Sequence, residues 1–366
     1  MPIFMDRHDV SEEVTAVHVA QLHQEDLKIE HKFNCKGLTY WFDEKRKMAF
    51  CLVEAPNEQA VHDMHDHAHG ELPHRIIEVD ENVVESFLGR IEDPEMNEIT
   101  NLKVIDDSAF RVIMVLEYKR RYLNKSNENL NLVNNFINLS VNLIENFDGR
   151  VVKQNSNKLL VSFTSVSKAV NCAREIQLKF EKFILNFDKL DLSLKISLCG
   201  GVPVTNNKGF FEDSIKFAER ICNTIEGKII ISSEVKELFD NENLESFNIN
   251  NFTQTLSPSD EKFLNLLLDY TEQVWNKTDL KIDDFSSHLG FSKSQLYRKM
   301  IALTNKSTNT FIKEYRLKKA LRLLNKQEGN ISEIAFETGF NSPTYFSKCF
   351  KETYGILPSN YSKESA

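Results

Sequence analysis

The chain has 366 residues, of which 41% are hydrophobic and 27% charged, a composition typical of a globular protein with two or three domains. No apolar run approaches the roughly 18 residues needed to span a bilayer, and no basic stretch followed by an apolar one opens the sequence. We therefore expect no membrane partner and a cytoplasmic location, where the six scattered cysteines would be free thiols.

The net charge of −9 is unevenly distributed along the chain. Residues 1–100 contain 22 acidic and 9 basic side chains, whereas residues 281–366 contain 8 acidic and 14 basic ones. An acidic head and a basic tail indicate different partners at the two ends, and the basic end is the candidate for binding a polyanion.

Residues 1–80 alternate between short strands and helices. The strand PIFMDRHD precedes a helix for which Ser11 is the expected N-cap, and two β-rich runs around EKRK predict a hairpin. A second helix is expected to begin after Asn57 and to stop at Gly70, before a last strand, RIIEVD. The order β-α-β-β-α-β predicts a ferredoxin-like sandwich, and the acidic residues 81–105 are expected to form a connector that is helical in part.

Residues 106–250 read as a second α/β unit, with a buried strand (FRVIMVLEY), a hairpin (GRVVKQNSNKLLVSF) and further strands alternating with helices. The polar segment NENLESFNINNFTQTLSPSD is expected to close this unit. Residues 259–366 change to nearly continuous helical periodicity with short breaks, which predicts an all-α domain of seven helices.

The C-terminal segment contains the same helical spacing twice. In residues 281–305 a helix is broken at Gly290 and Ser292 caps the next one, and in residues 330–355 the break falls at Gly339. A glycine able to take positive φ between two short helices is typical of a helix-turn-helix unit. One such match is weak evidence, but two copies joined by the helix TFIKEYRLKKALRLLN are much stronger.

The stretches FSKSQLYRKMIALTNKSTNTFIKEYRLKKALRLL and NISEIAFETGFNSPTYFSKCFKETYGILPSNY closely resemble the DNA-binding domain of AraC/XylS-type transcription regulators. This resemblance covers residues 280–361. It implies two recognition helices in successive major-groove segments of double-stranded DNA, with RNA polymerase as a further partner.

The second helix of each unit is expected to enter the groove. Arg298 is the candidate for base reading, because its fork can pair bidentately with guanine. The exposed sets are Lys293, Ser294, Gln295, Tyr297, Arg298 and Lys299 in the first unit and Ser342, Pro343, Thr344, Tyr345, Ser347 and Lys348 in the second. Lys306, Lys313 and Arg316 are candidate phosphate contacts. The alternative is that these charges form a solvated helix face, above all for Lys299 and Lys313.

Nine of the ten histidines lie within the first 74 residues, five of them in VHDMHDHAHGELPH. His65 and His69 are four residues apart on one helix, so they project from one face and suit a transition ion such as nickel or zinc. His62 is a possible third member, whereas His67 and His74 are expected at the surface. The rival interpretation is a pH sensor, since clustered histidines gain charge between about pH 5 and 7.

The stretches MPIFMDRHDV, LTYWFD, AFCLVEAPNEQAV and MHDHAHGELPHRIIEVD resemble a small family of ferredoxin-like proteins described as nickel-binding. The resemblance covers residues 1–80 and implies dimers and transition-metal binding rather than a known reaction. The ligands that it suggests are His8, His23, His65 and His69. No metal is expected to be required for DNA binding.

The middle segment resembles class III nucleotide cyclase homology domains in FDGRVVKQNSNKLLVSFTSVSKAVNCAREIQ and in LKISLCGGVPVTNNKGFFEDSIKFAERICNTIEGKIIISSEVKELF. Active members need two carboxylates to hold two metal ions. Here Glu117 and Asn157 stand at those positions, and Lys216 replaces an asparagine beside the retained Arg220. The resemblance therefore implies a degenerate domain without catalytic activity, useful for dimerisation or ligand sensing.

The combined interpretation is a homodimeric, sequence-specific DNA-binding regulator that responds to a transition metal at its N-terminal domain and is not an enzyme. The alternatives are a nucleotide-binding or nucleotide-cyclising signalling protein acting through the middle domain, or a metal-buffering protein.

Overall fold

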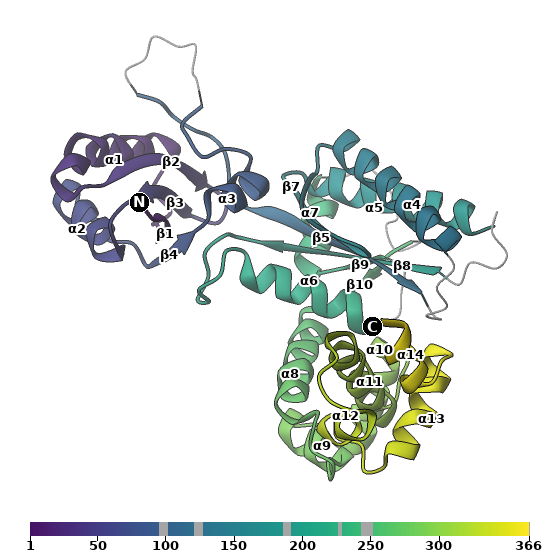
Figure 1. The fold of residues 1–366 in the computed structure, drawn as a ribbon. Helices are drawn as coiled ribbons and strands as arrows, with labels where there is room; N and C mark the ends of the chain where they lie inside the picture. The colour runs from purple at the N-terminus through teal and green to yellow at the C-terminus, as the bar shows by residue number, and fades with distance from the viewer. Residues whose placement is uncertain (95–101, 121–126, 186–191, 226–228, 243–251, 366) are drawn as a thin grey trace.

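The computed structural model describes residues 1–94, 102–120, 127–185, 192–225, 229–242 and 252–365. It arranges them as two lobes built on sheets and a third lobe made of helices (Figure 1). Among these residues, none of the helices combines the length and the apolar character that crossing a membrane requires. This arrangement confirms the predicted combination of α+β and all-α parts.

The N-terminal lobe is a four-stranded sheet in the order β2-β3-β1-β4, with antiparallel neighbours throughout. Its elements are β1 (Ile3–Asp9), α1 (Ala16–Ile29), the 3-10 helix η1 (Glu30–Phe33), β2 (Lys36–Asp43), β3 (Met48–Glu54), α2 (Glu58–Ala68) and β4 (Arg75–Val79). The predicted β-α-β-β-α-β order is confirmed.

The ends of the two N-terminal helices follow from local side chains. Helix α2 begins after Asn57, whose side chain accepts a hydrogen bond from the Ala60 amide, and Gly70 takes positive φ just beyond its end, both as predicted. The predicted cap of α1 at Ser11 is wrong, because the N-cap is Thr15. The side chain of His18 accepts a hydrogen bond from the Thr15 amide, so the helix begins four residues after the predicted position.

The connector contains helix α3 (Glu81–Leu88), which begins after Asp80 and buries Val84, Phe87 and Leu88. The guanidinium of Arg111 donates to the carbonyl oxygens of Phe87 and Leu88, both at 3.1 Å, and so ties the end of α3 to the middle lobe. Further along, Tyr40 of β2 donates to the Lys103 carbonyl at 3.0 Å. The described parts of the connector are therefore packed against both lobes.

The middle lobe is a six-stranded sheet in the order β10-β9-β8-β5-β7-β6, in which β8-β9 and β9-β10 are parallel and the other neighbours antiparallel. Its elements are β5 (Arg111–Arg120), α4 (Asn127–Asn146), β6 (Arg150–Asn155), β7 (Lys158–Phe163), α5 (Val166–Leu185), β8 (Leu192–Gly201), α6 (Glu212–Thr224), β9 (Ile229–Ile231), α7 (Ser233–Glu242) and β10 (Gln254–Thr255). Strand β10 lies in the segment expected to be only a polar closure, and residues 243–251 of that segment are outside the described residues.

Alternate residues of β5 serve two different cores, as the two-residue period of a strand requires. Val112, Met114 and Leu116 face the core shared with α4, α5 and α7. Ile113 and Val115 face α6, and that core continues into the helical lobe through Phe263 and neighbouring apolar residues of α8. The middle lobe and the helical lobe therefore share one continuous apolar contact along α6 (Figure 1).

The C-terminal lobe has the seven predicted helices within its described residues. They are α8 (Pro258–Val274), α9 (Ile282–Leu289), α10 (Lys293–Thr304), α11 (Thr308–Lys326), α12 (Ile331–Glu337), α13 (Pro343–Tyr354) and α14 (Pro358–Ser365). The long helix α11 buries Phe311 and Ile312 in one core and Leu317, Ala320 and Leu324 in another. It therefore joins two small helix-turn-helix units, one around α9 and α10 and the other around α12 and α13.

Candidate functional site

The first candidate DNA-reading helix is α10. Its N-cap Ser292 accepts from the Gln295 amide, and the Gln295 side chain accepts from the Ser292 amide, so a reciprocal capping box holds the start of the helix. Leu296 and Met300 are fully buried and fix the orientation of the helix. As a result the predicted residues of its first two turns lie exposed, namely Lys293, Ser294, Gln295, Tyr297 and Arg298.

Helix α13 repeats this design in the second unit. Ser342 caps it by accepting from the Tyr345 amide, Pro343 occupies the first turn, and Phe346 and Phe350 are buried. Thr344, Tyr345 and Lys348 are exposed, and Tyr297 of α10 and Tyr345 expose 56% and 53% of their surface. Ser342, Pro343 and Ser347 are half-buried. Two capped helices therefore each present a polar face with an exposed tyrosine.

Three cations predicted to contact DNA are engaged inside the protein. Lys299 forms an ion pair with Asp260 of α8 at 2.8 Å, and Lys306 forms one with Glu314 of α11 at 2.9 Å. The guanidinium of Arg316 donates through Nε to the Trp275 carbonyl at 2.7 Å and also to the Lys277 carbonyl. Lys299 and Arg316 therefore tie α10 and α11 to α8 and the residues after it, and Lys306 ties the turn before α11 to that helix. Lys293 and Arg298, in contrast, face outward.

The N-terminal lobe contains a buried group of side chains that we call the His/Asp cluster, made of Asp6, His8, Asp26, His65 and His69. The imidazole of His65 lies at its centre, with Nε2 2.9 Å from Asp6 Oδ2 and Nδ1 3.1 Å from Asp26 Oδ1. His69 Nε2 lies 3.2 Å from the same Asp26 oxygen. Strand β1, helix α1 and helix α2 each contribute to the cluster, so it exists only in the folded lobe.

The cluster perturbs the proton affinities of its members. Burial alone would raise the pKa of Asp6, but the imidazoles of His8 and His65 outweigh it and hold the pKa well below its usual range. Asp26 behaves in the same way, with a pKa lowered by His65 and His69 against the effect of burial. Burial lowers the pKa of His65, but Asp6 and Asp26 outweigh it and raise the pKa to about 10. The three groups form a strongly coupled set of charges and hydrogen bonds.

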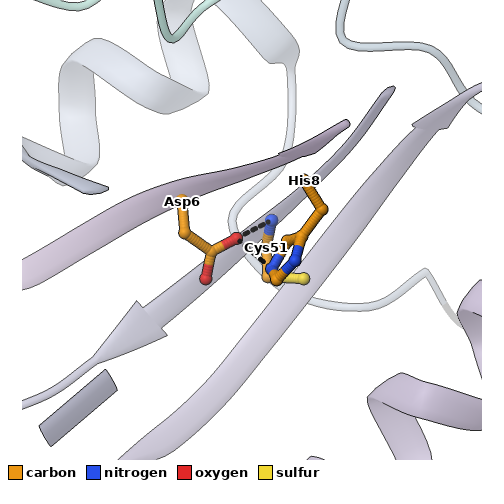
Figure 2. A group of neighbouring side chains, drawn as sticks. All are labelled: Asp6, His8 and Cys51. Carbon is orange, nitrogen blue, oxygen red and sulfur yellow. Dashed lines mark hydrogen bonds and ion pairs between the residues drawn. The ribbon is translucent and has the colours of Figure 1, made fainter. Parts of the chain in front are cut away.

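Within the described residues, two sets of three side chains place possible ligand atoms within 4.8 Å of one another, Asp26–His65–His69 and Asp6–His8–Cys51. Figure 2 shows the second set, in which Asp6 and His8 project from β1 toward Cys51 of β3. His8 Nε2 is buried without a hydrogen bond, although it lies 3.3 Å from Asp6 Oδ1. An unsatisfied buried imidazole nitrogen beside a carboxylate suits a metal ion.

His23 is the predicted ligand that the structure does not bring to the centre of the cluster. Its Nε2 lies 3.7 Å from Asp93 Oδ2, and its ring contacts Tyr40 at 5.0 Å between centroids. It still lines the cavity of about 390 Å³ that His8, His65 and His69 also line. His23 and Asp26 lie one turn apart on α1, and it is the turn with Asp26 that lies beside His65, whereas His23 lies beside Asp93.

The sequence interpretation missed both aspartates of the cluster and Cys51. Asp6 and His8 are two residues apart on one strand and so share a face, and Asp26 follows His23 by three residues on one helix. These spacings were the available signal for the two aspartates, whereas nothing in the sequence places Cys51 beside them. His67 and His74 are exposed, and the His74 ring accepts from the Asp9 amide at 3.1 Å.

The positions compared with cyclase metal ligands lie side by side in the middle lobe. Glu117 of β5 pairs with Lys158 in the strand register, and the adjacent Tyr118 amide donates to the Asn157 carbonyl at 2.8 Å. Glu117 also lies 3.0 Å from the Lys119 ammonium. The retained Arg220 points to the helical lobe, where it donates to Asn265 at 3.0 Å and pairs with Asp269. This arginine therefore joins α6 to α8.

These lobes define the class of protein: a double helix-turn-helix domain attached to a ferredoxin-like domain and a third α/β lobe. Residues 285–364 match the family described as "Helix-turn-helix domain", and residues 4–79 match "Nickel responsive protein SCO4226-like". Residues 285–364 are therefore similar to a helix-turn-helix family and residues 4–79 to the SCO4226-like family, which confirms both resemblances in these segments.

Among curated proteins, the chain is 40% identical over 107 residues to "Histidine kinase P4" of Formosa agariphila, covering 29% of this chain and 8% of that protein. It is 34% identical over 98 residues to "HTH-type transcriptional regulator MtrA" of Neisseria gonorrhoeae, covering 27% of this chain and 31% of the relative. The chain therefore spans less than a third of the length of either relative.

Among solved structures, SCO4226 from Streptomyces coelicolor A3(2) is 34% identical, with a TM-score of 0.20 over 21% of this chain and 94% of that one. A bacterial light-regulated adenylyl cyclase is 11% identical, with a TM-score of 0.30 over 65% of this chain and 86% of that one.

Proposed function

We propose that the protein is a sequence-specific DNA-binding transcription regulator. The observation that carries this proposal is the pair of capped, outward-facing helices α10 and α13, each the second helix of a helix-turn-helix unit. Such helices fit the major groove, and two of them on one rigid lobe suit successive groove segments on one face of the duplex. Arg298 is the proposed base-reading side chain, and the exposed hydroxyls and lysines around it contact phosphates.

The test begins by selecting preferred sites from random duplexes, because the target sequence is unknown. Binding of the selected duplex is then measured by fluorescence anisotropy for the wild type, Arg298→Ala and the control Lys262→Ala on α8. We expect Arg298→Ala to lose about 1–3 kcal/mol of discrimination at one base pair. Loss of affinity that is equal for all sequences would instead make Arg298 a phosphate contact, and absence of any selected site would refute sequence-specific binding.

A transition-metal ion, nickel or zinc, is the proposed ligand of the His/Asp cluster. Asp26, His65 and His69 would hold it, with Asp6 and His8 as the neighbouring donors. Imidazole nitrogens with carboxylate oxygens are a donor set that both metals accept. The unsatisfied His8 nitrogen and the name of the matching family support this assignment.

Calorimetric titration with Ni²⁺ and Zn²⁺ tests the metal site. We expect the double variant His65→Ala/His69→Ala to lose binding, while His67→Ala, on the same helix but exposed, keeps it. Circular dichroism checks that both variants remain folded. Tight binding that the double variant retains would place the metal elsewhere in the protein. Binding that is equally weak in the wild type and both variants would show that the histidines do not form a metal site.

Metal binding is proposed to act on DNA binding through the contact between the N-terminal and middle lobes. Arg7 lies between Asp6 and His8 on β1, and its guanidinium donates to the Val204 carbonyl of the middle lobe at 3.4 Å. We propose that the protein is a cytoplasmic homodimer, and that the Arg7–Val204 contact transmits metal binding to the spacing of its two DNA-reading lobes. RNA polymerase is proposed as a further partner. DNA affinity indifferent to metal would favour a metal-buffering role, and formation of cyclic nucleotide from ATP and Mn²⁺ would favour an enzyme.

A further inference from the structure

A cavity of about 760 Å³ lies between the middle lobe and the helical lobe, where α6 faces α8 and α11. Its size is within the range of roughly 300–1,000 Å³ typical of small-molecule sites. On α6, Lys216, Arg220 and Asn223 are spaced by four and three residues and so share a face. On the facing helix α11, Lys318 and Arg322 are four residues apart and also share a face, so polar side chains of both helices line the cavity.

The charges that line this cavity are not balanced. Each of its four carboxylates already has a cationic partner, in the ion pairs Asp269–Arg220, Glu272–Lys319, Glu314–Lys306 and Glu219–Lys158. Three lining cations remain, Lys216, Lys318 and Arg322, and among the described residues no carboxylate lies within 4.0 Å of them. A cavity whose acids are all neutralised and whose spare groups are cations is electrostatically suited to an anion.

Lys318 is the central cation of the three. Its ammonium reaches across the lobe boundary and donates to the Asn223 carbonyl of α6 at 3.3 Å. The side chain is open to the cavity, yet burial of its ammonium and the nearby ammonium of Lys119 lower its pKa to about 8, against the opposing effect of the Glu117 carboxylate. Like-charged neighbours make an unneutralised lysine costly, and a bound anion would remove that cost.

We propose that this cavity binds a phosphorylated small molecule, with phosphate oxygens accepting from Lys216, Lys318 and Arg322. Ammonium and guanidinium groups form short, charge-assisted hydrogen bonds with phosphate, and arginine can do so bidentately. Phe311 and Tyr315 of α11 and Leu268 of α8 supply an apolar wall beside these cations. A nucleotide and an inorganic polyphosphate both satisfy the phosphate contacts, and only the nucleotide has a ring to place against that wall.

The site has a regulatory consequence, because its walls belong to two lobes. A ligand that contacts both α6 and α11 binds only when the helical lobe is packed against the middle lobe as it is here. Binding therefore increases the population of this arrangement. This inference is independent of the metal site and of DNA binding, since it rests on the cavity alone.

The test is calorimetric titration of the full chain with ATP, adenosine and tripolyphosphate. The variant Lys318→Gln/Arg322→Gln is compared with the wild type and with the matched control Lys262→Gln, an exposed lysine of α8 outside the cavity. We expect ATP to bind the wild type and the control, and to bind the double variant at least about tenfold more weakly, because two charge-assisted contacts are lost.

Tripolyphosphate that binds as tightly as ATP, with the same loss in the variant, supports the proposal with inorganic polyphosphate as the source. Tighter binding of ATP supports it with a nucleotide as the source. The absence of binding by both phosphate compounds overturns the proposal. Binding that the double variant retains in full, or adenosine binding as tightly as ATP, overturns it as well. Hydrogen exchange provides a second readout, with slower exchange expected in α6 and α11 when ATP is bound.

Discussion

His65 Nε2 lies 2.9 Å from Asp6 Oδ2, and both side chains are almost completely buried, exposing 1% and 0% of their surface. The same carboxylate also accepts, through Oδ1, from the Cys51 amide at 3.0 Å. The Asp6 carboxylate therefore accepts hydrogen bonds from a side chain of α2 and from the backbone of β3. A buried ion pair stabilises a protein little more than apolar residues of the same size would. Removing one partner, however, is strongly destabilising, because the charge of the other partner stays buried without a counter-charge.

Asp6→Asn is therefore expected to lower the free energy of unfolding of the N-terminal lobe by about 3 kcal/mol in the absence of metal. Asp9→Asn is the control, because Asp9 is exposed on the same strand and forms a surface ion pair with Arg7, so it should cost less than about 1 kcal/mol. Urea unfolding is followed by the fluorescence of Trp41 in a Trp275→Phe background. Equal effects of the two substitutions would contradict a stabilising role for the buried pair.

The two turn glycines should differ in their response to alanine. Gly290 and Gly339 both have positive φ, at 71° and 81°, so each substitution strains the backbone by about 1–2 kcal/mol. A Cβ at Gly290 meets no atom within 4 Å, whereas a Cβ at Gly339 would lie 2.9 Å from Arg316 Nε and 3.0 Å from the Asn276 backbone. Gly339→Ala should therefore lower the thermal midpoint clearly more than Gly290→Ala, measured by circular dichroism at 222 nm. A larger loss for Gly290→Ala would contradict this packing.

The salt dependence of DNA binding should separate two lysines of α10. Lys293 is exposed, and its surface ion pair with Asp283 is readily exchanged for a phosphate, whereas Lys299 is held against Asp260 of α8. Lys293→Gln is expected to reduce the slope of log affinity against log salt by about one, and Lys299→Gln is expected to leave it unchanged. The reverse result would mean that Lys299 leaves Asp260 when DNA binds.

Acid should weaken the contact between α8 and α10. Burial would raise the pKa of Asp260, but the hydrogen bonds from Lys299 and Ser257 outweigh it and lower the pKa below its ordinary value of 3.8. Because the folded pKa is lower than the unfolded one, the stabilisation is complete above about pH 4 and is lost as the pH falls through the folded pKa.

The thermal midpoints of the wild type and Asp260→Asn should therefore converge as the pH is lowered from 7 to 3. A difference that stays constant over this range would show that the charge of Asp260 contributes nothing to stability.

Local features of the fold were predictable because short-range chemistry determines them. Asn57 and Ser292 cap helices, and Gly70, Gly290 and Gly339 take positive φ where the sequence places turns. The hairpin around EKRK also forms as predicted. In each case the deciding interaction joins residues only a few positions apart. The exception is α1, where Thr15 and His18 form the capping box instead of Ser11.

Long charged side chains were predicted less well, because their partners lie far away in the chain. The alternation of buried and polar residues on α10 places Arg298 and Lys293 outward. The same pattern cannot show that Lys299 meets Asp260, or that Arg316 reaches the carbonyl oxygens after α8. These contacts depend on how α8 crosses the first helix-turn-helix unit, and helix packing sets that crossing.

The sequence by itself determined that histidines are concentrated in the first 74 residues and that His65 and His69 share a helix face, because helical spacing is a local property. Only the tertiary structure decided that Asp6 and Asp26 complete the cluster and that His23 turns toward Asp93. The physical reason is that β1, α1 and α2 come together through apolar packing of the sandwich, and this packing chooses which polar side chains are buried side by side.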